Sequence, residues 1–372
     1  MDVANSLAQL RAKRGLSASK LAAEIGVSRQ TVYAIEAGTY VPNTAVSLKL
    51  ARVLEVAVED IFRLSEQADR PALEAEWLGG AGVFHAGQPV CLCRVNDRLI
   101  AVPPEPGIWG LPAADATILA PLRENKRHHR VKVQLLDEGW DKSERILMAG
   151  CDPSAPIVAH YMNRQGFRLV MLYVNSSRAL ELLKEGSVHV AGTHLVNERT
   201  GKFDLTRVKN TFGRNSVVVI SYARWEEGLV VAHRNPKNIL GVNDLARPEV
   251  EITNREPGAG CRRFLDSMLR KHGIAPSQVR GYERVTFGHL PAARLVRSGE
   301  VDCCISTGAA ARALKLDFIP LSSRPYHLVV RRGSLKLPAM QAFVEQLRRA
   351  SLRREVEAST GYDMSASGEF AA

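Results

Sequence analysis

The stretch that decides the fold of the N-terminal part is residues 16–38, LSASKLAAEIGVSRQTVYAIEAG. Its apolar residues recur at helical spacing and would pack two short helices together: Leu21, Ala22, Ile25, Val32 and Ile35. Gly26 stands between the helices, where a tight turn requires the left-handed backbone that glycine adopts readily. Ser28 occupies the position at which a hydroxyl caps the second helix. The stretch therefore predicts a helix, a short turn and a second helix.

The first turns of the second helix would present Arg29, Gln30 and Tyr33 outward. In a helix-turn-helix these positions enter the major groove, where Arg pairs with guanine and Gln with adenine. The alternative is an ordinary helical hairpin with solvated polar residues. Further short helices at residues 7–11, 45–53 and 58–62 argue against it, because together they would complete one compact core. We therefore expect a DNA-binding domain over residues 1–64 that binds a double-stranded operator.

Over residues 5–64 the sequence resembles the XRE (Cro/C1-type) helix-turn-helix family, including the ending Ile35-Glu36-Ala37-Gly38 of the second helix. The resemblance implies that several residues face bases or the adjacent phosphates: Ser28, Arg29, Gln30, Thr31 and Ala34. It also implies that Gly38, Thr39 and Asn43 approach the DNA backbone, and that the protein is a homodimer on inverted half-sites. Ala18 departs from the family, which often has a phosphate-contacting Gln there.

The composition allows two or three domains with real cores, since the chain has 372 residues, 45% apolar and 24% charged. A net charge of +11 suits a polyanionic partner. Residues 1–15 contain no apolar run of the kind a signal peptide needs, and no stretch is long enough to span a membrane. We therefore expect a cytoplasmic protein without a membrane partner.

The cysteines are not at the paired spacings of a structural zinc site: Cys91, Cys93, Cys151, Cys261, Cys303 and Cys304. We expect them to be small buried thiols, and we expect no metal and no cofactor. The sequence contains no Gly-x-Ser-x-Gly, no phosphate-loop pattern and no His-Glu-x-x-His. It therefore predicts no catalytic residues and a protein that is not an enzyme.

The rest of the chain changes pattern twice. Residues 65–71 are polar and predict a linker, and residues 72–144 favour a small β-rich connecting domain. In that domain, strands at residues 90–95 and 99–102 flank Asn96-Asp97, a pair suited to a tight hairpin. From residue 145 to 372, strands alternate with helices, which predicts an α/β domain of two lobes joined by crossing strands. Among its strands we expect separate segments at residues 216–220 and 228–233, and a return strand at 325–330.

Residues 145–365 resemble the periplasmic-binding-protein-like domain of bacterial regulators, which is related to molybdate-binding and tungstate-binding proteins. The segments that carry the resemblance are Met148-Ala149-Gly150-Cys151-Asp152-Pro153, Gly192-Thr193-His194-Leu195 followed by Thr200-Gly201, Arg255-Glu256-Pro257-Gly258-Ala259-Gly260-Cys261-Arg262, Gly299-Glu300-Val301-Asp302 and Gly361-Tyr362-Asp363. The resemblance implies a clamshell that closes on a small molecule, while the helix-turn-helix converts closure into altered DNA binding.

Candidate ligand residues follow the strands, because ligands bind beyond the carboxyl ends of strands in such sheets. Backbone N–H groups at the start of a helix, with arginines beside them, suit an anion. The candidates are Asp152, Ser154, Thr193, His194, Arg255, Gly258, Ala259, Gly260, Arg262, Ser306 and Thr307. Singly, each also has an ordinary structural role, such as a helix cap or a turn. The Asp152 carboxylate would repel a dianion. Either it caps the helix and turns aside, or the ligand carries a hydrogen-bond donor or a positive group.

The sequence therefore predicts a transcriptional regulator that responds to a small ligand. Molybdate or a similar oxyanion is one candidate, and a heterocycle or a zwitterionic metabolite is another. The alternative is a repressor whose C-terminal domain serves oligomerisation or protein contacts without binding a ligand.

Overall fold

The structure, a computed structural model, describes residues 3–64, 72–79, 84–104, 113–122, 129–136, 139–196, 203–213 and 216–371. The chain divides into two compact units, Met1–Pro71 and Ala72–Ala372. The linker predicted at residues 65–71 lies outside the described residues. Nowhere in the described ranges does a helix combine the length and apolar character that crossing a membrane requires.

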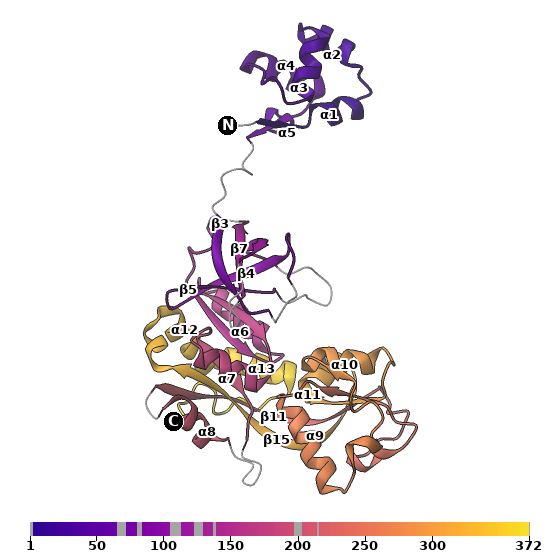
Figure 1. The fold of residues 1–372 in the computed structure, drawn as a ribbon, viewed down its shortest axis with the longest axis vertical. Helices are drawn as coiled ribbons and strands as arrows, with labels where there is room; N and C mark the ends of the chain where they lie inside the picture. The colour runs from indigo at the N-terminus through magenta and orange to yellow at the C-terminus, as the bar shows by residue number, and fades with distance from the viewer. Residues whose placement is uncertain are drawn as a thin grey trace. The chain divides into compact units, whose positions relative to one another are not determined.

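The first unit is a helical domain (Figure 1). Its helices are α1 (Leu7–Lys13), α2 (Ala18–Ile25), α3 (Arg29–Glu36), α4 (Thr44–Leu54) and α5 (Val58–Ile61). Gly26 ends α2 with a φ of 74°, and the Ser28 side chain caps α3 by accepting a hydrogen bond from Thr31 N. The residues predicted to pack the two helices are all buried in one core. The helix-turn-helix prediction is therefore confirmed.

Two contacts that the sequence did not predict hold α3 in this unit. The short strands β1 (Val3–Asn5) and β2 (Phe62–Leu64) pair antiparallel, and Asn5 Nδ2 donates to the Ile35 carbonyl at 2.7 Å. Arg11 Nε lies 2.5 Å from Glu36 Oε1, which ties α1 to the end of α3. Three-residue strands are too short for an alternating pattern to reveal.

The second unit begins with a closed five-stranded barrel in the order β3-β5-β4-β6-β7. Its strands are β3 (Ala72–Trp77), β4 (Pro89–Val95), β5 (Arg98–Val102), β6 (Ala116–Pro121) and β7 (His129–Leu135). The predicted hairpin is confirmed, because Val95 pairs with Arg98 and Asn96 takes the turn with a φ of 54°. The β-rich character of this region was predicted, but its closure into a barrel was not.

The barrel continues into an α/β region with an eight-stranded sheet in the order β13-β12-β14-β11-β15-β10-β8-β9. Its strands are β8 (Arg145–Gly150), β9 (Arg168–Tyr173), β10 (Val190–Thr193), β11 (Val217–Val231), β12 (Ile252–Arg255), β13 (Val285–Thr286), β14 (Cys303–Thr307) and β15 (Asp317–Arg331). Its helices are α6 (Ala155–Asn163), α7 (Ser176–Lys184), α8 (Leu205–Phe212), α9 (Gly260–Lys271), α10 (His289–Arg297), α11 (Gly308–Ala313), α12 (Pro338–Arg348) and α13 (Ala350–Thr360).

The prediction of separate strands at residues 216–220 and 228–233 was wrong, because β11 runs without interruption through both. Glu226 and Glu227 broke the apolar pattern, yet Glu227 is buried inside the strand. Ion pairs to His194 and Arg324 compensate its charge, and a sequence pattern does not show such partners. The strand predicted at 325–330 is likewise only the second half of β15.

The long strands β11 and β15 divide the sheet into two lobes. The end of β15 lies between β10 and the start of β11 and pairs with both, whereas the end of β11 pairs with β14. Figure 1 shows α9, α10 and α11 around one lobe and α6, α7, α12 and α13 around the other. Each lobe has its own buried clusters, so the predicted pair of lobes joined by crossing strands is confirmed.

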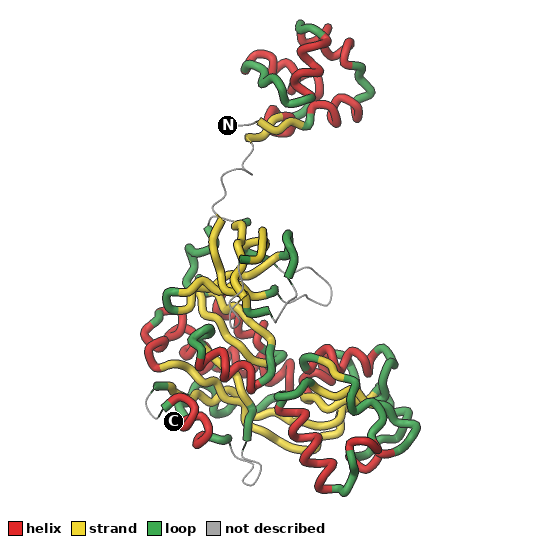
Figure 2. Tube along the Cα trace, in the orientation of Figure 1, coloured by secondary structure: helices red, strands yellow, loops and turns green. Residues whose placement is uncertain are grey.

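The barrel and the first lobe share a hydrophobic core. Val95 and Ile100 of the barrel pack in one cluster with Leu147 of β8. Asp115 of the barrel accepts hydrogen bonds from Arg145 at 2.7 Å and from Arg168 at 2.8 Å. The barrel strands therefore lie directly against the first-lobe strands, as Figure 2 shows. This shared core crosses the domain boundary predicted after residue 144.

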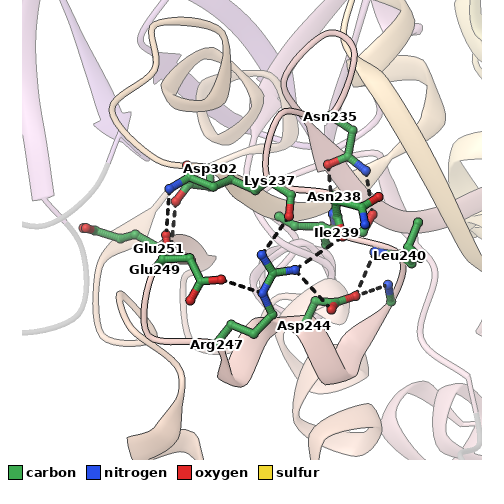
Figure 3. A network of polar contacts seen from close by, with 11 residues as sticks. Asn235, Lys237, Asn238, Ile239, Leu240, Asp244, Arg247, Glu249, Glu251 and Asp302 are labelled. Carbon is green, nitrogen blue, oxygen red and sulfur yellow. Dashed lines mark hydrogen bonds and ion pairs between the residues drawn. The ribbon is translucent and has the colours of Figure 1, made fainter.

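A polar network closes the long connection between β11 and β12 in the second lobe (Figure 3). The Arg247 guanidinium donates to the Lys237 carbonyl at 2.8 Å and to Glu249 at 2.8 Å. Asp244 caps the same segment by accepting from Leu240 N at 2.8 Å. The Arg247 guanidinium and the Asp244 carboxylate are thus engaged in hydrogen bonds within the lobe. We therefore assign this network a structural role and do not treat it as a ligand site.

Candidate functional site

The outward face of α3 exposes the side chains that the sequence predicts to contact bases. Arg29 and Gln30 are exposed on its first turn, and Tyr33 follows one turn later with 45% of its surface exposed. The Arg29 guanidinium donates to the Tyr33 hydroxyl at 2.9 Å and lies 5.2 Å from the ring centroid. Tyr33 therefore holds the Arg29 fork on this face, where nothing in the described part of the domain covers it.

The other residues expected near DNA are engaged in local hydrogen bonds. Ser28 Oγ lies 2.8 Å from Thr31 Oγ1, and Thr39 Oγ1 donates to the Ala34 carbonyl at 3.0 Å. Asn43 Oδ1 caps α4 by accepting from Val46 N at 3.0 Å. These contacts position the ends of α3 and α4, and their role toward DNA stays a prediction.

A cavity of about 690 Å³ opens in the second unit. Its walls come from three parts of the fold: Trp77 from the barrel, Leu172 and Cys151 from the first lobe, and Phe287 and His289 from the second. The cavity thus lies at the carboxyl ends of β8 and β12, where the sequence placed the ligand. The contribution of the barrel was not predicted.

Arg255 is the one residue among the predicted ligand contacts that lines this cavity in the described structure. It ends β12 and is almost fully buried, with Nε and Nη2 donating to the Glu256 carboxylate at 2.9 and 3.0 Å. Its remaining nitrogen, Nη1, is buried and has no hydrogen-bond partner among the described residues. A buried donor without a partner is costly, so this atom is suited to an anionic acceptor.

Asp152 and Ser154 belong to a buried network behind the cavity. Asp152 Oδ1 accepts from Ser154 N at 3.0 Å and from the Tyr362 hydroxyl at 3.1 Å, while Ser154 Oγ lies 2.5 Å from the Tyr222 hydroxyl. Burial raises the pKa of the Asp152 carboxyl, although these hydrogen bonds oppose the rise. The Asp152 carboxyl is therefore engaged by Ser154 and Tyr362. This agrees with the interpretation in which it turns away from a ligand.

His194 follows β10 and meets a buried acidic partner. Its Nδ1 lies 2.5 Å from Glu227 Oε1, and Arg324 Nε lies 3.1 Å from Glu227 Oε2. Burial alone would lower the pKa of His194, but the Glu227 carboxylate outweighs burial and raises the pKa to about 9. A Cβ at Gly260 would lie 2.4 Å from His194 Cε1, so glycine is required there for the ring to fit.

His289 and Cys151 are residues of the cleft that the sequence analysis missed. His289 begins α10, and its Nδ1 lies 3.2 Å from Ser306 Oγ. Cys151 directly follows β8, and its Sγ and a ring nitrogen of His194 lie within 4.8 Å of each other. His289 had no signal in the sequence, because its partners are distant along the chain. Cys151 lay inside a segment already singled out, but its partners were unknown.

The remaining predicted ligand residues surround the cleft without lining the large cavity. Thr307 Oγ1 is buried with no hydrogen-bond partner among the described residues, and Gly258 takes a φ of 90° before α9. Arg262 donates to the Arg255 carbonyl at 3.1 Å, which fixes the end of β12. Thr193 is buried at the end of β10, and Ala259 is buried directly before α9.

Comparison with known proteins identifies both parts of the chain. Residues 158–348 match the family described as PBP superfamily domain, and residues 7–61 match the family described as helix-turn-helix. Both resemblances found in the sequence are thereby confirmed.

Relatives match each part separately. The chain is 30% identical over 230 residues to the uncharacterised protein YvgK of Bacillus subtilis (strain 168), covering 62% of this chain and 74% of YvgK. It is 44% identical over 63 residues to the uncharacterised HTH-type transcriptional regulator YgzD of the same organism, covering 17% of this chain and 96% of YgzD. Among solved structures, the sulfate-binding protein SubI of Mycobacterium tuberculosis H37Rv superimposes with a TM-score of 0.44 at 19% identity, covering 59% of this chain and 86% of SubI.

Proposed function

Since the chain belongs to the PBP superfamily and carries an N-terminal helix-turn-helix domain, we propose that it is a DNA-binding transcriptional regulator controlled by a small anionic effector. The effector binds in the cleft of the second unit, and the helix-turn-helix binds an operator, as a homodimer in the cytoplasm. The single observation that carries the proposal is the Arg255 guanidinium at the wall of a large cavity, with one buried nitrogen lacking a partner.

The cavity favours an organic anion over a bare oxyanion. Its volume of about 690 Å³ falls in the range of pockets that hold drug-sized molecules. Apolar side chains contribute much of its wall, among them Trp77, Leu172 and Phe287. We therefore infer that the effector has an apolar body and an anionic group that accepts from Arg255. Molybdate remains the smallest candidate.

The effector arm of the test uses the full chain and thermal unfolding. The ligands are molybdate, tungstate, sulfate and phosphate, followed by a panel of aromatic and aliphatic carboxylates and phosphates. We expect at least one to raise the unfolding temperature of wild type and to change operator affinity, because a ligand bound only to the native state stabilises it. Arg255→Ala should lose both responses, and Arg255→Lys should retain part of them.

Arg280→Ala is the matched control, because Arg280 lies exposed in the same lobe and pairs with Glu251 at 3.0 Å. It should respond like wild type. An Arg255→Ala protein that unfolds cooperatively and still responds normally removes Arg255 from the site. If no ligand of either class shifts wild type, the C-terminal domain serves protein contacts instead.

The DNA arm compares Arg29→Ala with wild type on a duplex selected from genomic fragments and on a random duplex. Loss of a bidentate base contact should cost about 1–3 kcal/mol on the selected duplex and much less on the random one. Arg14→Ala, which removes an exposed pair with Glu55, is the control and should bind the selected duplex like wild type. Equal losses on both duplexes would show that Arg29 contacts phosphate and does not read bases.

A further inference from the structure

Three potential metal ligands meet at the crossing of the two lobes. One ligand atom each from Cys151, His194 and His289 can be chosen so that all three lie within 4.8 Å of one another, and all three residues are buried. In a tetrahedral zinc site the ligand atoms are separated by roughly 3.3–3.6 Å, given Zn–S near 2.3 Å and Zn–N near 2.0–2.1 Å. The ligand atoms therefore need to approach one another by at most about 1.5 Å, which side-chain rotations can supply.

His289 has one buried ring nitrogen without a partner among the described residues. Ser306 Oγ lies 3.3 Å from the His289 carbonyl, which can only accept, and 3.2 Å from His289 Nδ1. When the Ser306 hydroxyl donates to the carbonyl, Oγ accepts from His289 Nδ1–H. This tautomer leaves Nε2 unprotonated, and Nε2 is buried with no hydrogen-bond partner among the described residues. An imidazole oriented by an outer hydrogen bond with its other nitrogen free is the usual state of a metal-binding histidine.

His194 has the same kind of outer support. Glu227 Oε1 lies 2.5 Å from its Nδ1, which fixes the ring and leaves Nε2 as the nitrogen available to an ion. Arg324 holds the second oxygen of Glu227 at 3.1 Å. A carboxylate behind a ligating histidine orients the ring and raises its basicity. Two histidines and one cysteine, both rings oriented from behind, form a more complete site than three residues in mere proximity.

We propose that Cys151, His194 and His289 bind one d¹⁰ transition-metal ion, Zn²⁺ or Cu⁺. Thiolate and imidazole ligands suit both ions, whereas Mg²⁺ and Ca²⁺ prefer oxygen. Binding requires the Cys151 thiolate and neutral imidazoles, so protons leave to solvent as the ion enters. Cys151 and His289 also line the large cavity. A fourth coordination position is thus open to water or to the anionic group of an effector.

The ion would join the two lobes. Cys151 and His194 follow strands of the first lobe, whereas His289 begins α10 of the second. An ion bound by all three residues would hold the two lobes in the arrangement seen here. This consequence extends the proposed function, but the site itself does not depend on it, because metal binding is measured without DNA and without effector.

The experiment uses the full chain, reduced and freed of metal by a chelator. Zn²⁺ is titrated by calorimetry, and Cu⁺ is titrated anaerobically against a chromophoric chelator. We expect one ion per chain and a thiolate charge-transfer band when Co²⁺ replaces Zn²⁺. Cys151→Ser and His289→Gln should each weaken binding by roughly 100-fold or more, since even outer-shell changes cost 10–100-fold.

Cys91→Ser is the matched control, because Cys91 lies on β4 of the barrel, away from the cluster. It should bind like wild type, and circular dichroism of each metal-free variant should match wild type. The proposal is overturned if wild-type protein binds no ion, if Cys91→Ser loses as much affinity as Cys151→Ser, or if bound Co²⁺ shows no thiolate band. The Co²⁺ measurement needs only wild-type protein. It therefore tests whether a cysteine thiolate binds the ion even if a variant misfolds. If the protein binds no operator DNA, the proposed function fails, but the measured metal binding is unaffected because it requires no DNA.

Discussion

His189 shows how one buried side chain sets a pH limit on the second unit. It is 4% exposed, and its Nδ1 accepts a hydrogen bond from Leu147 N at 2.9 Å. Burial lowers the pKa of His189 to about 4, against an ordinary value of about 6.5. Between these values the unfolded chain binds a proton that the folded chain does not, so stability falls as pH drops from 6.5 to 4.

We predict that this histidine alone removes on the order of 3 kcal/mol of stability by pH 4, given about 1.4 kcal/mol per pKa unit. His189→Gln keeps an acceptor for Leu147 N–H but cannot titrate. Urea unfolding at pH 7, 6, 5 and 4 should therefore give a shallower loss of stability for the variant than for wild type. Parallel curves for the two proteins would contradict the assignment.

At the same scale, the sequence identified residues whose role follows from their neighbours in the chain. Arg255 was placed at the cleft because it ends a strand before a glycine-rich turn, and the structure puts it there. Asp152 needed the fold for its interpretation, since Tyr222 and Tyr362 come from distant segments. Cys151 and His289 likewise needed the fold for their interpretation, because one follows β8 and the other begins α10, and no spacing rule links two such distant residues.

At the scale of elements, β11 and β15 connect the two lobes, and the irregular pairing lies between them. The register shifts between Ser221 and Ala223 and again between Glu227 and Gly228. A bulge bends a strand and increases its twist. The irregular pairing therefore flanks Trp225, whose ring centroid lies 5.0 Å from that of His194 and 5.6 Å from that of His289.

The contact between the barrel and the first lobe gives a prediction about element docking. Asp115 is 4% exposed and pairs with Arg145, which is 6% exposed. Removing one partner of a buried pair leaves the other charge uncompensated, at a cost of about 3–5 kcal/mol. Asp115→Ala should lose that much stability in chemical denaturation.

Glu74→Ala serves as the control for this change. Glu74 lies on the same barrel and pairs with Arg130 at 2.8 Å, but both side chains are 58% exposed. Exposed pairs contribute about 0–1 kcal/mol, so this variant should remain close to wild type. If Asp115→Ala is no more destabilised than Glu74→Ala, the Asp115 pairs do not hold the barrel in place.

At the scale of the whole molecule, sequence patterns predicted the individual domains. They did not predict how the barrel closes or how it packs against the first lobe. The helix-turn-helix depends on residues that lie close in the chain, such as Gly26 and Ser28, and was predicted element by element. The barrel closes through the pairing of β3 with β7, which are separated along the chain by three further barrel strands, β4, β5 and β6. Its shared core with Leu147 depends on the tertiary fold, so composition and periodicity could not show it.

The division into Met1–Pro71 and Ala72–Ala372 predicts how the full chain unfolds. Two units with separate cores should give two calorimetric transitions, each matching that of the corresponding isolated fragment. Zn²⁺ or an effector should shift only the transition of fragment 72–372, because a ligand stabilises only the unit that binds it. A fragment that starts at residue 145 should unfold at a lower temperature, since it exposes Leu147 and leaves Arg145 without Asp115. A single transition for the full chain, moved as a whole by ligand, would show that the two units unfold as one.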